Sequence, residues 1–332
     1  MSSVKKVAER AGVSTATVSR VLMDKPHVRP ELRQRVLAAM EDLDYHPNLV
    51  ARSLRVQKSN IIGLIVSDIR NPFFTYVSRA IEDVAQTQGI SVFLGNSDEN
   101  PEKELTYLEQ MRGQKVAGII FSPTRHSADN FSDLFDLNLP MVIIDRRVRN
   151  AAVDSVLIDN VESSYRLTEH LITHGYRQIA GLFGEASTTA RERREGFVQA
   201  LEDHALEPDP ELVRNVNATE EDGYQATRKL LAAPDRPRAL YTSNGLLATG
   251  AFRALRESGL AIPGEIAFVT IDDTPWTRLV SPQITVIQQP TYEIGKTAIE
   301  LLLERIQDSS RPTRQVVLQS HLVVRHSCGL HD

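Results

Sequence analysis

The apolar positions at the start of the chain repeat with the period of a helix. One set, at spacings of three and four residues, predicts a first short helix: Val4, Val7, Ala8 and Ala11. A second set predicts another helix just after it: Val18, Val21 and Leu22. Gly12 and Ser14 stand between the sets, where glycine ends a helix cleanly and a serine hydroxyl caps the next one. The pattern predicts two helices joined by a tight turn, a helix-turn-helix.

A third helix is predicted over residues 29–44, with Pro30 at its start. The apolar residues expected on its buried face are Leu32, Val36, Leu37, Met40 and Leu43. Together the three helices form a domain over residues 1–46. A core this small is only marginally stable alone.

From residue 61 onward, continuous apolar runs alternate with amphipathic stretches. The predicted strands are Ile61–Val66, Ile90–Leu94, Val116–Phe121, Met141–Ile144, Ile179–Phe183, Ala239–Thr242 and Ile266–Ile271. The predicted helices are Phe73–Thr87, Glu102–Arg112, Val161–His174, Arg191–His204, Asp222–Ala232, Leu246–Ser258 and Tyr292–Ile306. Buried strands that alternate with helices are typical of parallel sheets covered on both faces. The fold class is therefore an α/β body of two doubly wound lobes behind an all-α helix-turn-helix domain.

The distribution of charge separates the two parts. The net charge of the chain is -5, yet residues 1–58 hold 11 Lys and Arg against 6 Asp and Glu. A basic head on an acidic body indicates that the head contacts a polyanion. Cys328 is the only cysteine, no apolar run reaches the length of a membrane span, and the first residues lack a signal stretch. We therefore expect a cytoplasmic protein without disulfides.

In a helix-turn-helix the second helix lies in the major groove of DNA. The face opposite its apolar residues carries Thr15, Ala16, Ser19 and Arg20. Arg20 can bind guanine O6 and N7, and Thr15 and Ala16 can contact bases through methyl groups. Thr17 and Ser19 are better placed for phosphates, and Ser14, the cap, stands at the same helix start.

The run VAERAGVSTATVSRVL, then YHPN and then VARSLR, resembles the LacI/GalR (lactose-repressor) family. The resemblance covers essentially the whole chain, and it implies a homodimeric repressor that binds a palindromic operator. It places Thr15, Ala16 and Arg20 at base-reading positions and His27 at a backbone-contacting one. Two departures stand at Met23-Asp24, where many members have an asparagine, and at Arg29, where a serine is usual.

The resemblance also implies a hinge over residues 47–59. In the family, two hinge helices pair in the minor groove, and a leucine from each wedges into the central base step. Leu54 matches that leucine, Ala51 matches the small residue where the hinges meet, and Asn48 is a possible cap of this helix. An apolar wedge that unstacks a base step is a general device of minor-groove binding.

For residues 60–332 the resemblance implies a periplasmic-binding-protein-like body that binds an effector. We place its three crossovers near Leu157–Asn160, Ile287–Gln289 and Val317–Ser320. The first lobe is then 60–157 with 289–318, and the second is 158–288 with 319–330.

Open α/β sheets bind ligands at the carboxyl ends of their strands. The residues singled out there are Phe73, Phe74, Asp145, Arg146, Arg193, Asn244, Asp272 and Trp276. Carboxylates and the planar side-chain groups of arginine and asparagine bind vicinal hydroxyls of a sugar, and aromatic faces cover its C–H surfaces. Arg193, Asn244 and Asp272 match the family's effector positions.

Plainer interpretations stay open for several of these residues. Asn71 and Asp272 can serve as caps, Arg193 can belong to a solvated helix start, and Trp276 can be a core or dimer residue. Arg146 and Arg147 favour an acidic or phosphorylated sugar, so the expected effector is a sugar, a sugar acid or a sugar phosphate.

Two other classes of protein compete with a regulator. A sugar-converting enzyme would need a nucleotide motif or an acid/base pair, and neither G-x-G-x-x-G nor a P-loop occurs. A sugar-transport protein would share the body but need a signal peptide. His170 and His174 have the spacing of a helical zinc pair, but His174-Gly175 has the character of a helix end. We expect no cofactor, no metal and no catalytic thiol.

Overall fold

The computed structural model describes residues 4–22, 28–45, 60–131, 139–149, 152–185 and 187–329. The chain divides into two compact units, residues 1–59 and residues 60–332. Among the described residues, no helix is long and apolar enough to cross a membrane.

The first unit is a bundle of three helices. These are α1 (Val4–Ala11), α2 (Thr15–Leu22) and α3 (Pro30–Asp42). Their buried residues form one small core: Val7, Ala8, Ala11, Val18, Val21, Val36 and Ala39. The helix-turn-helix predicted from the apolar pattern is therefore present, with a third helix packed against it.

The turn between α1 and α2 is held from outside by α3. Gly12 has a φ of +61°, and the Nη2 group of Arg35 donates to the carbonyl oxygens of Ala11 (2.6 Å) and Gly12 (3.1 Å). A guanidinium that satisfies carbonyls at a helix end replaces the hydrogen bonds the helix cannot make itself. The prediction for α3 was wrong at Leu37, which is 51% exposed, while Ala39 is buried.

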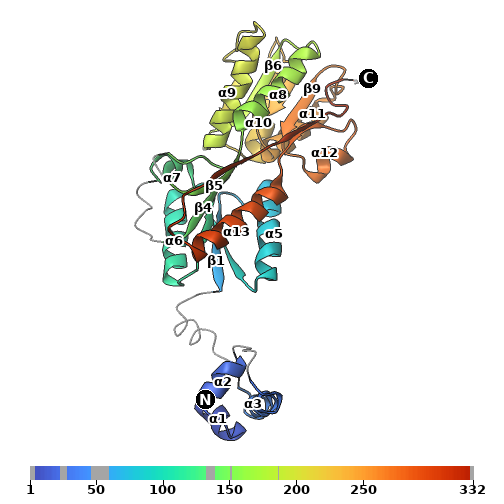
Figure 1. The fold of residues 1–332 in the computed structure, drawn as a ribbon. Coiled ribbons are helices and arrows are strands. Elements are labelled where there is room, and N and C mark those ends of the chain that lie inside the picture. The colour runs from blue at the N-terminus through green and yellow to red at the C-terminus, as the bar shows by residue number, and fades with distance from the viewer. Residues whose placement is uncertain are drawn as a thin grey trace. The chain divides into compact units, whose positions relative to one another are not determined.

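The first lobe of the second unit is a parallel sheet of six strands, in the order β11-β5-β4-β3-β1-β2. Its strands are β1 (Ile61–Val66), β2 (Ser91–Asn96), β3 (Ile119–Phe121), β4 (Met141–Ile144), β5 (Asp154–Ile158) and β11 (Gln315–Leu318). Helices α5 (Pro72–Thr87) and α13 (Thr291–Gln307) cover one face, and α6 (Pro101–Gly113) covers the other (Figure 1). The short helix α7 (Arg125–Asp129) follows β3.

The second lobe repeats this design in the order β12-β10-β9-β8-β6-β7. Its strands are β6 (Ile179–Gly184), β7 (Val213–Val216), β8 (Ala239–Thr242), β9 (Ala267–Ile271), β10 (Thr285–Gln288) and β12 (His321–Val323). Helices α8 (Asn160–Thr173) and α9 (Thr188–Asp203) cover one face, and α10 (Glu220–Ala232) and α11 (Gly245–Ser258) cover the other. A short helix, α12 (Pro275–Leu279), follows β9. The edge strand β12 runs antiparallel to β10, which the expectation of parallel sheets did not include.

The chain passes between the lobes three times: between β5 and α8, between β10 and α13, and between β11 and β12. At the first and third passages, the hydroxyls of Ser163 and Ser320 lie 2.7 Å apart. All seven predicted strands are present, three with the predicted ends and four with shifted ends, and five of the described strands were not predicted. Those are β5, β7, β10, β11 and β12, of which all but β7 adjoin the passages.

We predict that two helix pairs of the second lobe depend on glycine. A Cβ atom at Gly196 would overlap the carbonyl of Val161, and one at Gly250 would overlap the carbonyl of Glu220. Because backbone cannot yield as a flexible side chain does, Gly196→Ala and Gly250→Ala should each lower the free energy of unfolding by about 1–3 kcal/mol or more.

The matched control is Gly113→Ala, since Gly113 ends α6 and has nothing within 4 Å of the added atom. This change should be neutral or raise stability by up to about 1 kcal/mol. Urea unfolding of the four chains tests the prediction, and equal stability of all of them would contradict it.

Candidate functional site: the cleft between the lobes

A cleft lies where the carboxyl ends of the strands of both lobes meet. It encloses about 290 Å³. The first lobe contributes Ser67, Asp68, Arg70, Asn71, Phe73, Phe74, Asp98, Glu99, Asp145 and Arg146. The second lobe contributes Ser187, Thr189, Ala190, Arg193, Asn217, Ala218, Thr219, Ser243, Asn244, Leu246 and Asp272, and Gln289 lies in the second passage. Seven of the eight predicted effector residues are therefore brought together.

Two carboxylates of the cleft stand on unusual backbone. Asp145 follows β4 with a φ of 68°, and Asp272 follows β9 with a φ of 86°. Residues other than glycine adopt such angles only where the surrounding structure holds them, and these conformations cluster at functional sites. The two residues occupy equivalent places, one at the end of a strand in each lobe.

Arg193 in α9 is fixed by neighbours on two elements. Its Nε donates to Asn160 Oδ1 (2.9 Å), and its Nη1 donates to the carbonyl oxygen of Ser243 (2.6 Å). The residue is 5% exposed. Nη2 is the nitrogen that remains to donate to a ligand, and its position is set by the other two bonds.

Asp272 connects the second lobe with the second passage. Its Oδ2 accepts from the backbone N–H of Gly245 (3.0 Å), and its Oδ1 accepts from Gln289 Nε2 (2.6 Å). Asn244 caps α11 by accepting from the N–H of Leu247 (2.9 Å). The amide Nδ2 of Asn244 is then the group that can donate to a ligand, while each Asp272 oxygen has a further lone pair to accept with.

Arg146 and Asp145 lie side by side in the wall of the first lobe. Arg146 Nε is 3.4 Å from Asp145 Oδ2, and the two terminal nitrogens of Arg146 bind the carboxylate of Glu99. Burial raises the pKa of Asp145, against the opposing effect of Arg146 and Arg193. Burial opposes the charge of Arg146, yet the hydrogen bonds that it donates to Glu99 keep its pKa raised.

The aromatic residues divide between the cleft and the cores. Phe73 and Phe74 line the cleft with their rings edge to face at 5.0 Å, but they are only 4% and 3% exposed and belong to the core of the first lobe. Trp276 is not brought into the cleft. Its ring packs against Phe252 at 5.1 Å, beside the core of the second lobe. The core interpretation of Trp276 is thus the one that the geometry supports.

Several cleft residues were not predicted. Glu99 follows β2, and the rule that selects strand ends would have found it had it been applied to that strand. Asn217 and Thr219 follow β7, which was missed because Arg214 and Asn215 interrupt its apolar run. Ser187 and Thr189 sit at the start of α9, where Ser187 caps the helix.

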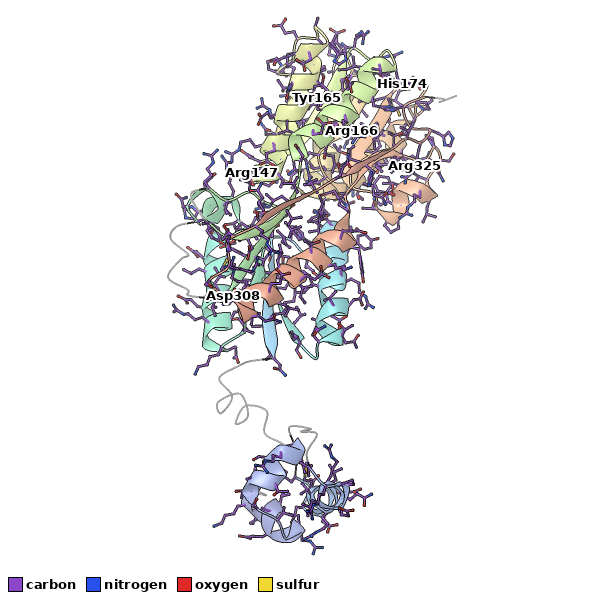
Figure 2. The ribbon with its side chains drawn as sticks, viewed as in Figure 1. Arg147, Tyr165, Arg166, His174, Asp308 and Arg325 are labelled. Atoms are coloured by element: carbon purple, nitrogen blue, oxygen red, sulfur yellow. The ribbon has the colours of Figure 1, made fainter. Side chains whose placement is uncertain are left out.

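Ion pairs join the lobes beside the cleft. Arg191 of α9 lies 3.5 Å from Asp129 of α7, and Arg125 donates to the carbonyl oxygen of Glu185 (3.2 Å). Arg147, which Figure 2 labels near the boundary of the lobes, is 3.9 Å from Glu192 and 54% exposed. Each contact pairs a group of the first lobe with one of the second, so these contacts exist only when the lobes are close.

The head presents its predicted DNA-reading residues on α2. Thr15, Ala16 and Arg20 are exposed, and Thr17 and Ser19 are half-buried. Ser14 caps α2, as predicted, by accepting from the N–H of Thr17 (3.2 Å). Four residues assigned to DNA contact lie outside the described residues: His27, Asn48, Ala51 and Leu54.

The side chains of His170 and Cys328 are in contact, with Nε2 and Sγ 3.2 Å apart. Burial raises the pKa of Cys328 to about 11, so its thiol stays protonated and a poor nucleophile at neutral pH. Within the described ranges, no group of three His, Cys, Asp or Glu side chains could hold a metal ion.

A helix-turn-helix unit followed by two lobes with a polar cleft between them defines a ligand-responsive DNA-binding protein. Comparison with known families agrees. Residues 3–48 match the model of bacterial regulatory proteins of the lacI family, and residues 59–326 match periplasmic binding proteins and the sugar binding domain of the LacI family. The chain belongs to the LacI family of bacterial transcription regulators.

Relatives match along almost the whole chain. The HTH-type transcriptional repressor PurR of Pasteurella multocida is 35% identical over 98% of both chains. The ribose operon repressor of Halalkalibacterium halodurans is 35% identical over 98% of this chain and 97% of its own. The structure of the Lac repressor dimer bound to operator and the anti-inducer ONPF is 29% identical, covers 99% of each chain and has a TM-score of 0.87.

These matches decide among the three classes of protein. The relatives are transcriptional repressors, a class that is not enzymatic, and the lacI DNA-binding model separates this chain from transport proteins that share its body. The protein is a transcriptional repressor with a domain for a small effector, and dimers that bind an operator are typical of its family.

Proposed function

We propose that the effector of this repressor is an uncharged monosaccharide, bound in the cleft by Arg193, Asn244 and Asp272 from one lobe and by Asp145 from the other. The observation that carries the proposal is the pair of strand-end carboxylates, Asp145 and Asp272, which lie in opposite walls of one cleft. A ligand with hydroxyl groups on both edges can donate to both carboxylates at once, and it then holds the two lobes together.

The charge of the cleft favours an uncharged ligand. Five carboxylates line it, from Asp68, Asp98, Glu99, Asp145 and Asp272, against three guanidinium groups, from Arg70, Arg146 and Arg193. An anion entering this cleft meets an excess of negative charge in a partly desolvated space.

The two arginines that favoured an acidic or phosphorylated sugar do not supply a free cation. The fork of Arg146 is occupied by Glu99, and Arg147 is exposed and near Glu192. This argues against the charged sugars in the earlier expectation and leaves the neutral sugar.

A purine is the second class of ligand to weigh against a sugar, since the relatives include a transcriptional repressor named PurR beside a ribose operon repressor. A cavity of about 290 Å³ stands at the small end of ligand pockets. The rings of Phe73 and Phe74 are almost fully buried, so they offer little face for stacking a flat purine. Hydroxyl-binding groups dominate instead, which favours a sugar such as ribose.

The proposed mechanism couples the cleft to the operator. The effector stabilises the closed arrangement of the lobes, and closure turns the first lobe of one protomer against that of its partner. Tyr76, Leu94 and Leu105 support a dimer face there, because they are exposed on α5, on the edge strand β2 and on α6. The effector changes operator affinity only by its differential affinity for the two arrangements.

The remaining assignments belong to the same proposal. We keep residues 1–46 as the DNA-binding domain, 47–59 as the hinge, and the lobe boundaries given from the sequence. The three passages support those boundaries, since each falls between strands of different sheets. A protein that reads chromosomal DNA is placed in the cytoplasm.

We predict that a neutral sugar raises the thermal stability of the full chain. Ligand at about 100 times its dissociation constant should add about 2.7 kcal/mol to the free energy of unfolding. Differential scanning fluorimetry with D-ribose, other neutral aldoses and free purine bases identifies the class.

The increase in thermal stability on adding the sugar should disappear in Arg193→Lys, which removes a fixed donor, and in Asp272→Asn, which removes a charged acceptor. It should persist in Arg194→Gln, because Arg194 is an exposed residue of the same helix that does not line the cleft. Stabilisation by a purine base and by no sugar would overturn the sugar assignment but not the cleft.

For the head, we predict that two substitutions weaken DNA binding in different ways. Arg20→Ala removes a base contact and should cost about 1–3 kcal/mol on the operator while changing its sequence preference. Leu54→Ala removes the proposed wedge and should weaken operator binding more than binding to random duplex.

Fluorescence anisotropy with an operator selected in vitro and a scrambled duplex measures both. Arg10→Ala is the control for charge, since Arg10 pairs with Asp42 away from the reading face of α2. Equal losses on the two duplexes for Leu54→Ala would contradict the wedge assignment.

A further inference from the structure

Arg146 is the only guanidinium in the first lobe's share of the cleft that is buried, with its side chain 3% exposed. Its Nη1 donates to Glu99 Oε2 (2.8 Å) and to the carbonyl oxygen of Pro123 (2.7 Å). Its Nη2 donates to Glu99 Oε1 and to Ser67 Oγ (3.4 Å). All four terminal N–H groups therefore have acceptors, and only Nε faces Asp145 without a hydrogen bond.

A buried guanidinium fork is the group that proteins use to bind carboxylates and phosphates through two parallel hydrogen bonds. In this cleft the fork already holds a carboxylate from the chain itself. Without Glu99, Arg146 would present two donors and a full positive charge to whatever entered the cleft.

Glu99 is held in this position by a strained loop. Asp98 and Glu99 follow β2 with φ angles of 51° and 56°, which two neighbouring residues other than glycine rarely share. The N–H of Glu99 donates to the carbonyl oxygen of Ser67 (3.0 Å), and Lys103 binds the side chain of Asp98. Strain of this kind persists where the surrounding structure imposes it.

The pair is accessible from the cleft. Glu99 lines it, and its side chain is 27% exposed, so an anionic ligand and the carboxylate of Glu99 compete for one place. A pair that served stability alone would need no exposure to the ligand space.

We propose that Glu99 is a specificity-determining residue: its carboxylate occupies the fork of Arg146 and so excludes anionic effectors from the cleft. The proposal rests on the function proposed above for its choice of sugar, but the exclusion of anions can be tested without a sugar. Replacing the carboxylate by an amide of the same shape should convert the first wall of the cleft into an anion site.

The experiment compares four full-length chains: the wild type, Glu99→Gln, the double variant Glu99→Gln with Arg146→Gln, and Glu102→Gln. Glu102 is an exposed acidic residue near the start of α6, so its variant removes one charge from the same region without touching Arg146. Thermal unfolding is recorded in sodium sulfate and in sodium chloride at equal ionic strength. Binding of D-ribose and of D-ribonate, its open-chain anion with C1 oxidised to a carboxylate, is measured by calorimetry, and each ratio of the two is compared between chains.

Sulfate stabilises folded proteins in general. The result that counts is therefore the rise in unfolding temperature from chloride to sulfate, in excess of the same rise in the Glu102→Gln chain. Glu99→Gln should show such an excess rise in unfolding temperature, and the excess should saturate as the sulfate concentration increases. The double variant should lose it. The ratio of dissociation constants for D-ribonate over D-ribose should fall by about tenfold or more in Glu99→Gln, as expected for loss of one repulsive, partly buried charge.

Absence of an excess sulfate shift in Glu99→Gln, or an equal shift in Glu102→Gln, would overturn the proposal. If Glu99→Gln fails to fold in chloride, sulfate should restore its folding, and Glu99→Ala provides a second chain with the same expectation. Failure of both variants to fold in either salt would also overturn it. If neither sugar binds any chain, the sugar assignment fails, while the sulfate result still decides the role of Glu99.

Discussion

The site depends on one constraint, which is that all strands of a parallel sheet end at the same edge. Residues that follow β1, β2 and β4 therefore gather at one edge of the first sheet, and those that follow β6 to β9 gather at one edge of the second. The three passages of the chain place these two edges opposite each other. Neither lobe forms the cleft alone, so the affinity for a ligand depends on how the two lobes are arranged.

Buried charge explains how binding and closure are linked. Arg193 and Asp272 are buried and the side chain of Asp145 is 10% exposed, and each keeps hydrogen-bonding capacity that the protein does not fill. Polar groups removed from water cost free energy unless they are paired. A ligand that supplies the missing partners lowers that cost only when both lobes contact it. The ion pair between α7 and α9 adds a weaker and more exposed contribution to the same arrangement.

The sequence could predict most of the fold, because long apolar runs that alternate with helices mark the central strands of both sheets. It missed the buried strands β5 and β10, whose apolar runs are short and flanked by polar residues, and it failed again where burial is partial. β7 is an edge strand with polar residues, and β11 and β12 are short, half-exposed strands beside a passage of the chain. At Leu37 the helical period was right but its phase was not, since α3 buries the small residue Ala39 against α1 and α2.

The site was predictable to the extent that its residues follow predicted strands, as Asp145, Asn244 and Asp272 do. Trp276 satisfied the same rule, but its ring packs against Phe252. The pairing of Arg146 with Glu99 and the hold of Arg35 on the turn after α1 join residues far apart in sequence. Periodicity carries no information about such contacts, and for that reason the pairing of Arg146 with Glu99 could not be predicted.

The central claim is that closure of the cleft by an effector changes the affinity of the head for DNA. The most direct test is a titration of the full chain, bound to an operator selected in vitro, with D-ribose while anisotropy of the labelled operator is recorded. The account predicts that operator affinity changes by about fivefold or more, in the range typical of coupled sites, while affinity for scrambled DNA stays constant. Binding of the sugar with no change in operator affinity would contradict the account.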